Sequence, residues 1–337
     1  MNKSKKFKIG NEVILPGVRK KVQLEVASLF DYTKLTIPIE VIRGKEEGPI
    51  LFISAAIHGD EINGVEIIKR ILKYKDLNKI KGTLILIPIV NVFGFNNKSR
   101  YLPDRRDLNR CFPGSLNGSL GSRLAKIFMR EIVNKCTHGI DLHTGAIHRS
   151  NLPQIRACLD DPATDELSKK FGTPIVINSA LRDGSLREAA RKKNVVTLLF
   201  EGGEALRFEE NVIQSGYNGC LSIMKEIGML KSIKTKRSKK HDSFVAQGSY
   251  WVRAPHSGSF AMKVKLGDHV YAGDTLATIS DPFGENSYDV KVEDEGIVIG
   301  MSMIPLVSKG DAMVHIATFK NSYQVKNALT GYQNDTY

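Results

Sequence analysis

Apolar residues follow two different patterns along the first two thirds of the chain. Buried parallel strands read as continuous apolar runs, and "PILFISAAI" (49–57), "GTLILIPIV" (82–90) and "VVTLLFEGG" (195–203) are runs of this kind. Helices instead repeat apolar residues every three or four positions, as "INGVEIIKRILKY" (62–74) and "SRLAKIFMREIVNKC" (122–136) do. Because such strands and helices alternate, the pattern predicts an α/β sheet flanked by helices.

Further segments complete this layout. "KVQLEVAS" (21–28) and "TIPIEVIRG" (36–44) read as strands and suggest an antiparallel pair at the start of the fold. "HGIDLHTG" (138–145) predicts a short strand that runs into a loop. "SLREAARKKN" (185–194) and "VIQSGYNGCLSIMKEIGML" (212–230) predict two more helices, the second of which closes this part of the chain.

The pattern changes after a basic run, "KSIKTKRSKK" (231–240). Short apolar stretches separated by Gly-Asp and Ser-Gly turns follow, which indicates an all-β unit. A weak internal repeat, "SGSFAMKVKLGDHVYAGDTLATI" against "EGIVIGMSMIPLVSKGDAMVHIA", predicts a small closed β-sandwich with pseudo-twofold symmetry. We therefore divide the chain into a first unit at 1–230, a basic linker at 231–243, the β unit at 244–320 and a polar tail at 321–337, which we expect to fray.

Charge and composition narrow the function classes. The chain is 42% hydrophobic and 25% charged, as ordinary globular chains are. Its formal net charge of +13 would suit nucleic acid or small anions. The sequence lacks zinc fingers and aromatic-rich basic motifs, and the basic run reads better as a solvated linker. We therefore expect no nucleic-acid partner.

Membrane and secreted classes are not favoured either. No run approaches the ~18 apolar residues of a membrane span, and the basic N-terminus lacks the apolar region of a secretory signal. The four cysteines are widely spaced and form no C-x-x-C motif, as expected for reduced thiols. We expect a cytoplasmic protein without a membrane partner. The oligomeric state stays open, a homo-oligomer included.

Candidate chemistry begins where the first apolar run ends, at His58 and Glu61. Both lie at a strand-to-helix junction, and sites in α/β sheets collect at the carboxyl ends of strands. His143 ends the short strand "GIDL" and completes a His₂Glu set, the ligand set of catalytic zinc sites. Asp141, two residues earlier, would be an outer group that orients His143. The alternative for each histidine is an ordinary core or surface residue; we read the other six histidines that way, His148 least securely.

Two further stretches offer polar side chains. "NNKSRYLPDRRDLNRCFPG" (96–114) is a long basic loop, and loops of this length are usually functional. Its arginines can bind carboxylates or stabilise an oxyanion; we read Arg105 and Arg106 as solvated. "TLLFEGGE" ends a strand with Glu201 and Glu204, either of which could take a proton from water. The sequence pattern does not separate these two.

Taken together, "HGDE", "RYLPDRRDLNRCFPG", "DLHTG" and "FEGGE" resemble the aspartoacylase and succinylglutamate desuccinylase family of zinc carboxypeptidase-like hydrolases. The resemblance covers about residues 45–230 and implies a mixed sheet flanked by helices. It also implies one zinc ion per chain. The matching positions are His58, Glu61 and His143 for zinc, Asn109 and Arg110 for the substrate carboxylate, Arg100 for polarising the scissile carbonyl and Glu201 for the general base.

The C-terminal β unit resembles a barrel-sandwich hybrid of the biotinyl or lipoyl type. The "FAMKVK" stretch resembles the sequence around a modified lysine. In modules of this type, however, the modified lysine lies at the hairpin between the two repeats, and that hairpin here, "SDPFGENS", has no lysine. We therefore expect an unmodified module that walls one side of the active-site mouth.

The resemblance implies a zinc-dependent amidohydrolase, a deacylase or desuccinylase that cleaves the linear amide of a small anionic N-acyl amino acid. Metal-activated water would attack, with Glu201 as the base. Two alternatives remain: a zinc carboxypeptidase acting on peptides, and a catalytically silent binding protein.

Overall fold

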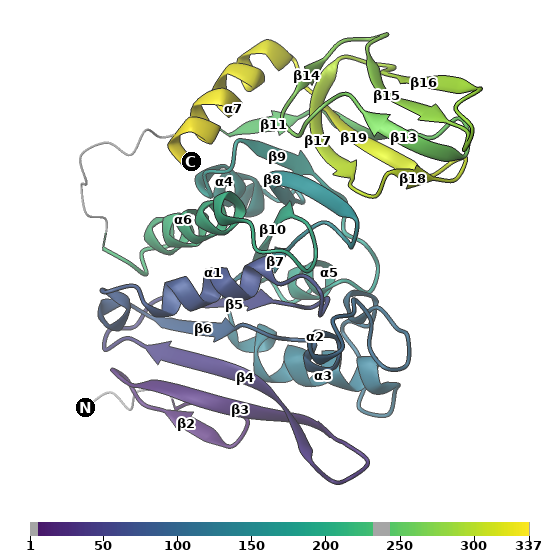
Figure 1. The fold of residues 1–337 in the computed structure, drawn as a ribbon. Coiled ribbons are helices and arrows are strands. Elements are labelled where there is room, and N and C mark those ends of the chain that lie inside the picture. Colours follow the sequence, from purple (N-terminus) through teal and green to yellow (C-terminus); the bar gives the residue numbers. More distant parts are fainter. Residues whose placement is uncertain (1–5, 232–242, 337) are drawn as a thin grey trace.

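The computed structural model describes residues 6–231 and 243–336, and Figure 1 shows their arrangement. Most of the predicted basic linker, at 232–242, lies outside the described residues. None of the helices within the described ranges is long and apolar enough to cross a membrane.

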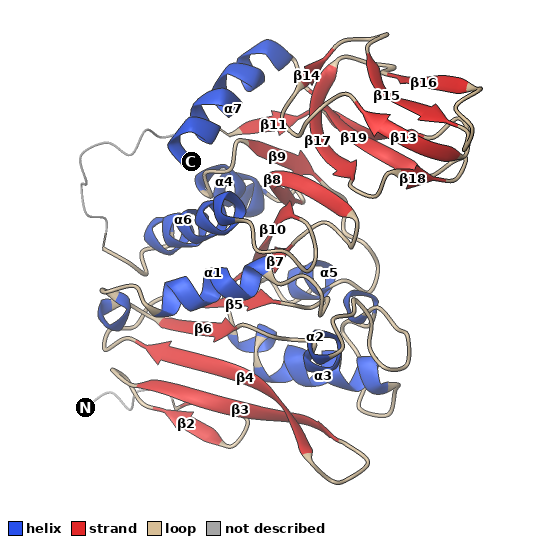
Figure 2. Ribbon diagram, in the orientation of Figure 1, coloured by secondary structure: helices blue, strands red, loops and turns tan. Residues whose placement is uncertain are grey.

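Among the described residues, thirteen strands form one mixed sheet that crosses the whole molecule (Figure 2). Ten of them lie side by side in the order β12 (Gly248–Arg253), β19 (Ala312–Thr318), β17 (Gly296–Ser302), β8 (Arg149–Ala157), β10 (Val196–Gly203), β7 (His138–His143), β5 (Ile50–Ala55), β6 (Thr83–Ile87), β4 (Lys34–Arg43) and β3 (Arg19–Ser28). Off this row, β9 (Ile175–Asn178) pairs with β8 and with β11 (Phe244–Ala246), while β14 (His269–Val270) pairs with β17.

The centre of this sheet confirms the predicted α/β fold. Strands β6, β5, β7 and β10 run parallel, so their carboxyl ends meet at one edge. The predicted antiparallel pair is β3 with β4. A separate small hairpin, β1 (Phe7–Ile9) with β2 (Glu12–Ile14), precedes them.

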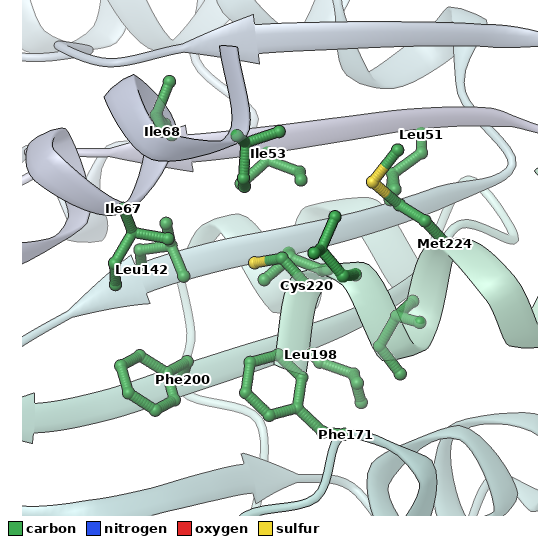
Figure 3. Packing of buried hydrophobic residues seen from close by; sticks show 14 of the residues in the cluster. Leu51, Ile53, Ile67, Ile68, Leu142, Phe171, Leu198, Phe200, Cys220 and Met224 are labelled. Carbon is green, nitrogen blue, oxygen red and sulfur yellow. The ribbon is translucent and has the colours of Figure 1, made fainter. Parts of the chain in front are cut away.

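Helices cover both faces of the sheet. One face packs against α1 (Asn63–Leu72), α4 (Pro162–Lys170) and α6 (Glu210–Glu226). The other packs against α3 (Leu120–Glu131) and α5 (Leu186–Arg191). Figure 3 shows Ile67 of α1 and Met224 of α6 against Leu51, Leu142 and Phe200 of the strands. Four further helical elements are short: α2 (Val92–Asn96), η1 (Leu77–Lys79), η2 (Leu108–Arg110) and η3 (Val133–Lys135).

The C-terminal part is all β up to Thr318, as predicted. A second, four-stranded sheet has the order β16 (Ser287–Lys291), β15 (Thr275–Ser280), β13 (Gly258–Met262) and β18 (Leu306–Val307). Its apolar side chains share a core with those of β12, β17 and β19. The hairpin without lysine joins β15 to β16.

The C-terminal strands are also continuous with the central sheet, which the pattern did not indicate. β17 pairs antiparallel with β8, and β11 pairs parallel with β9. The boundaries that we placed at residues 230 and 244, between the first unit and the β unit, therefore stay predictions. The strands β8 and β9 and helix α4 were not among the predicted elements.

The prediction that the polar tail frays was wrong. Residues Ser322–Thr336 form helix α7. Val325 and Leu329, four positions apart, are buried against Ile175 and Ile297 of the sheet. Two apolar residues on one helical face suffice here because the sheet offers an apolar surface to cover.

Candidate metal centre and active site

Three candidate ligands meet at the carboxyl edge of the parallel strands. His58 and Glu61 lie in the loop between β5 and α1, and His143 is the last residue of β7. Since β5 and β7 are parallel neighbours, both strand ends reach the same place (Figure 1). One ligand atom from each side chain lies within 4.8 Å of the others, and no other group of this kind occurs in the part of the chain that the structure describes.

The Glu61 carboxylate stands between the two imidazoles. Its Oε1 lies 2.6 Å from His58 Nδ1, and its Oε2 lies 2.7 Å from His143 Nδ1. The backbone N–H of Thr144 donates to the same Oε2 over 3.1 Å. All three candidate ligands are buried, being at most 5% exposed. The Nδ1 atoms of both rings therefore face the same carboxylate.

Carboxylates hold the far nitrogen of each ring. Asp141 Oδ2 lies 2.8 Å from His143 Nε2, which is the outer contact expected of Asp141. Asp107 Oδ1 lies 3.1 Å from His58 Nε2. Such outer carboxylates orient metal-binding histidines. Asp107 was not among the predicted site residues, although its position in "DLNR" offered a signal.

The electrostatics of this group follow from burial and close opposite charges. Burial alone would raise the pKa of Glu61, but the facing His58 and His143 outweigh it and hold that pKa well below its usual range. Burial alone would lower the pKa of His143, but Asp141 and Glu61 raise it well above its usual value. Opposite charges thus stabilise one another in this buried group, and a metal ion bound here would take the place of protons on the rings.

The long basic loop brings Arg100 to this centre. Its Nη1 donates to Glu61 Oε1 over 3.1 Å, and its Nη2 donates to Asp107 Oδ2 over 3.0 Å. Arg105 and Arg106 are exposed, as expected of solvated side chains.

Asn109 and Arg110 lie in η2 of the same loop. Asn109 is buried, and its Oδ1 accepts a hydrogen bond of 2.9 Å from the backbone N–H of Leu186 at the start of α5. Arg110 is exposed, and its Nη1 donates to the Asn109 carbonyl over 2.6 Å. This loop and the start of α5 therefore form a continuous wall beside the centre.

A cavity of about 290 Å³ opens over the candidate ligands. The predicted site residues Arg100, Asn109, Arg110 and Glu201 all line it, together with His58, Glu61 and His143. The structure therefore brings all seven predicted residues to one cavity.

The two carboxylates that the pattern could not separate have different surroundings. Glu201, in β10, lines the cavity and forms an ion pair with Arg156 of β8. Glu204 follows β10, and its Oε1 accepts a hydrogen bond of 3.1 Å from the backbone N–H of His148. Glu204 thus holds the loop after β7, and His148 is exposed rather than part of the ligand group.

Several lining residues were not predicted. They comprise four more arginines and one tryptophan, namely Arg149, Arg156, Arg182, Arg187 and Trp251. Trp251 comes from β12 of the C-terminal part, so that part does wall the cavity, as expected of it. The Arg149 Cζ lies 5.2 Å from the centroid of the Trp251 ring, and the His315 ring stacks on Trp251 with centroids 4.5 Å apart. The lone tryptophan of the sequence was the available signal.

Comparison with known proteins agrees with this architecture. Residues 47–227 match the model of the succinylglutamate desuccinylase/aspartoacylase catalytic domain. The chain is 26% identical over 296 residues to an N-alpha-acetyl-L-2,4-diaminobutyric acid deacetylase of Halomonas elongata, covering 83% of this chain and 85% of the relative.

Solved structures show the same fold. A succinylglutamate desuccinylase/aspartoacylase from Rhodobacter sphaeroides superposes with a TM-score of 0.80 at 23% identity, covering 89% of this chain and 96% of the other. The product-bound ectoine utilization protein EutE (DoeB) from Ruegeria pomeroyi also gives a TM-score of 0.80, at 24% identity, covering 89% and 95%.

Proposed function

The chain belongs to the succinylglutamate desuccinylase/aspartoacylase family, and from this premise we propose that it is a zinc-dependent hydrolase of small N-acyl amino acids. The observation that carries the proposal is the buried His58, Glu61 and His143 group at the floor of a cavity lined by Glu201 and arginines. A deacetylase of an N-acyl amino acid is among the relatives, which supports the same chemistry.

The donor set suits zinc. Two imidazole nitrogens and one carboxylate are the ligands of many catalytic zinc sites, which keep a fourth position open. In this chain the outer contacts from Asp141 and Asp107 leave the Nδ1 atoms of His143 and His58 as the ligand atoms. Zinc held by such a set supplies Lewis acidity, which activates water and polarises a carbonyl.

Side chains of the protein would then transfer the proton, stabilise the oxyanion and hold the substrate. Glu201 would accept a proton from the attacking water and pass it to the leaving nitrogen. A C–O bond to the acyl carbon forms, the amide C–N bond breaks, and the products are a carboxylic acid and an amino acid. Arg100, beside Glu61, would stabilise the oxyanion that develops on the carbonyl. Asn109 and Arg110 would hold the substrate carboxylate and so fix its orientation.

The volume of the cavity helps to choose between a small substrate and a peptide. A cavity of about 290 Å³ with Trp251 at its wall has room for a small molecule rather than for an extended peptide. We therefore favour an N-acyl amino acid over a peptide substrate.

The test measures metal content and hydrolysis of a panel of N-acyl amino acids and one tetrapeptide. We would compare wild type, Glu201→Gln and, as the matched control, Glu204→Gln, whose amide oxygen can still accept the His148 hydrogen bond. We expect about one zinc per chain in all three, and a loss of turnover of at least about 100-fold in Glu201→Gln alone.

Other results would contradict parts of the proposal. Zinc in all three proteins without turnover by the wild type would favour the silent binding protein. Turnover of the tetrapeptide alone would favour the carboxypeptidase. A purified protein that binds no zinc would contradict the ligand assignment.

A further inference from the structure

A second cavity, of about 330 Å³, lies near the opposite end of strand β10 from the candidate metal centre. Val196 and Thr197 at the start of β10 line it, whereas Glu201, near the end of that strand, lines the first cavity. Val196 and Glu201 are five residues apart, which is about 16 Å along a strand. Among the described residues, Arg187 alone lines both cavities. The second cavity is therefore a separate space that shares one wall residue with the first.

Arg187 brings a buried positive charge to this second cavity. The residue is 8% exposed, and no carboxylate of the described residues lies within 4.0 Å of its guanidinium. That guanidinium donates to the Arg156 carbonyl oxygen and to Ser179 Oγ, each over 3.3 Å. Arginine offers five N–H donors, so three of them have no partner within the described ranges. Burying a charge is costly unless the charge is paired, and an anion beside Arg187 would lower that cost.

Arg191 supplies a second guanidinium, one helical turn after Arg187 in α5. Side chains four residues apart lie on the same face of a helix, and both arginines line the second cavity. Arg191 Nη1 donates to Cys158 Sγ over 2.7 Å, and no described carboxylate lies within 4.0 Å of Arg191. Glu188, which lies between the two arginines in the sequence, pairs instead with Lys192. Two guanidiniums without carboxylate partners therefore border one cavity.

One carboxylate, that of Asp161, also lines the second cavity. Its Oδ2 accepts hydrogen bonds from the backbone N–H of Thr164, over 3.1 Å, and from the Thr164 hydroxyl. Asp161 thereby caps the N-terminus of α4, where the helix dipole offsets its negative charge. The amide of Asn194, an exposed residue, adds a neutral donor to the lining. The charged side chains of the lining are thus two arginines and one capped aspartate, and the cavity is positive.

We propose that the second cavity is a binding site for a small oxyanion, a phosphate or a carboxylate, held between the Arg187 and Arg191 guanidiniums. The paired N–H groups of a guanidinium match two oxygens of either anion. A cavity of about 330 Å³ has room for such an anion and for part of a small molecule that carries it. The inference goes beyond the proposed hydrolysis, because it uses no candidate metal ligand and no step of the reaction.

Arg191 distinguishes this site from the first cavity. An anion in the first cavity would also reach Arg187, since that side chain lines both cavities. Arg191, Cys158 and Asn194 line only the second of these two cavities. An anion that needs Arg191 and covers Cys158 is therefore bound in the second cavity.

Alkylation of Cys158 in the whole purified protein reports whether the second cavity is occupied. The Cys158 thiol lies beside Arg191, so an anion held by that guanidinium shields it. Iodoacetamide labelling followed by peptide mass spectrometry gives the rate for Cys158 and, as a reference, the rate for Cys111, which lines neither cavity. The probes are sodium phosphate and sodium acetate, each compared with sodium chloride at the same ionic strength.

We expect phosphate or acetate to slow the alkylation of Cys158 about fivefold at about four times its dissociation constant, with the Cys111 rate unchanged. Arg191→Gln should weaken binding of that anion by at least about tenfold. The matched control, Arg123→Gln, replaces an exposed arginine that lines neither cavity and should behave as wild type. Each variant is compared with itself without the anion, because Arg191 also contacts the thiol. The more protective anion identifies the class of oxyanion.

Equilibrium dialysis with radiolabelled phosphate and acetate gives a second readout that does not depend on thiol reactivity. At the same anion concentration, wild type should bind an additional anion per chain relative to Arg191→Gln, whatever binds in the first cavity. Arg191 is exposed, so its replacement should leave the fold intact. Equal anion counts in the two proteins would overturn the proposal. Protection of Cys158 that persists in Arg191→Gln, or that chloride matches, would overturn it as well.

Discussion

The Asp141 carboxylate lies two residues before His143 in strand β7, and its Oδ2 stands 2.8 Å from the Nε2 of that imidazole. The other carboxylate oxygen accepts a hydrogen bond of 2.8 Å from the Ser54 hydroxyl of the neighbouring strand β5. Asp141 is fully buried, so this contact is shielded from water. The ring of His143 is thereby fixed with Nδ1 toward Glu61.

The first prediction concerns metal affinity. Asp141→Asn removes the negative charge that orients and polarises His143, and we expect zinc affinity to fall by about 10- to 100-fold. Competition with a chromophoric chelator measures this. The exposed Asp160→Asn serves as the control and should bind zinc as wild type does. Equal affinity in Asp141→Asn and wild type would show that the outer contact does not tune the site.

The second prediction concerns the close packing of α1 on the sheet. A Cβ at Gly64 would lie 2.7 Å from the Cβ atoms of both Ala55 and Leu142. Gly64→Ala therefore overpacks the contact beside the metal centre, and we expect a loss of about 1–3 kcal/mol in the free energy of unfolding. The matched Gly248→Ala, whose Cβ would meet only Thr318 Oγ1 at 3.6 Å, should change it by less than about 0.5 kcal/mol. Denaturant unfolding measures both, and similar values for the two would refute the packing argument.

The third prediction concerns the C-terminal wall. Trp251 stacks on His315 and lies beside the Arg149 guanidinium. Trp251→Ala removes the ring that keeps the Arg149 guanidinium in place at the cavity. We therefore expect KM for the best N-acyl substrate to rise by about tenfold with little change in kcat. Trp251→Phe keeps an aromatic face and should restore most of the loss. A fall in kcat with KM unchanged would place Trp251 in the chemical step instead.

The fourth prediction concerns acid stability. His315 is 4% exposed. Burial, together with the positive charge of Arg156, lowers its pKa to about 3. The unfolded chain binds a proton there below the usual value of 6.5 while the folded chain does not, so stability falls as the pH drops from 6.5 toward 3. At pH 5 the loss is about 2 kcal/mol.

His315→Gln has no such proton to bind, so its free energy of unfolding should fall less between pH 7 and pH 5 than that of wild type. Denaturant titrations at both pH values give the difference. The exposed His256→Gln is the control and should follow wild type. An identical pH dependence in His315→Gln and wild type would contradict the burial of a neutral imidazole.

Much of the metal centre could be predicted from local sequence. His58 and Glu61 follow an apolar strand and precede a helix, and His143 ends another strand. Parallel strands place their carboxyl ends at one edge of a sheet, and these side chains meet there because β5 and β7 are neighbours. The pattern was less reliable for the tail, because the burial of Val325 and Leu329 depends on a surface supplied by distant strands.

The chain's own residues determined the α/β alternation, the all-β C-terminal part and the identity of the candidate ligands, because each depends on neighbours in sequence. Only the tertiary structure showed the different contacts of Glu201 and Glu204. It also placed Asp107 against His58 and brought Arg156 and Trp251 to the cavity. The positions of Arg156 and Trp251 depend on β8 pairing with β10 and on β17 pairing with β8. Pairings between strands far apart in the chain have no local signature, since they are selected by the packing of the whole sheet.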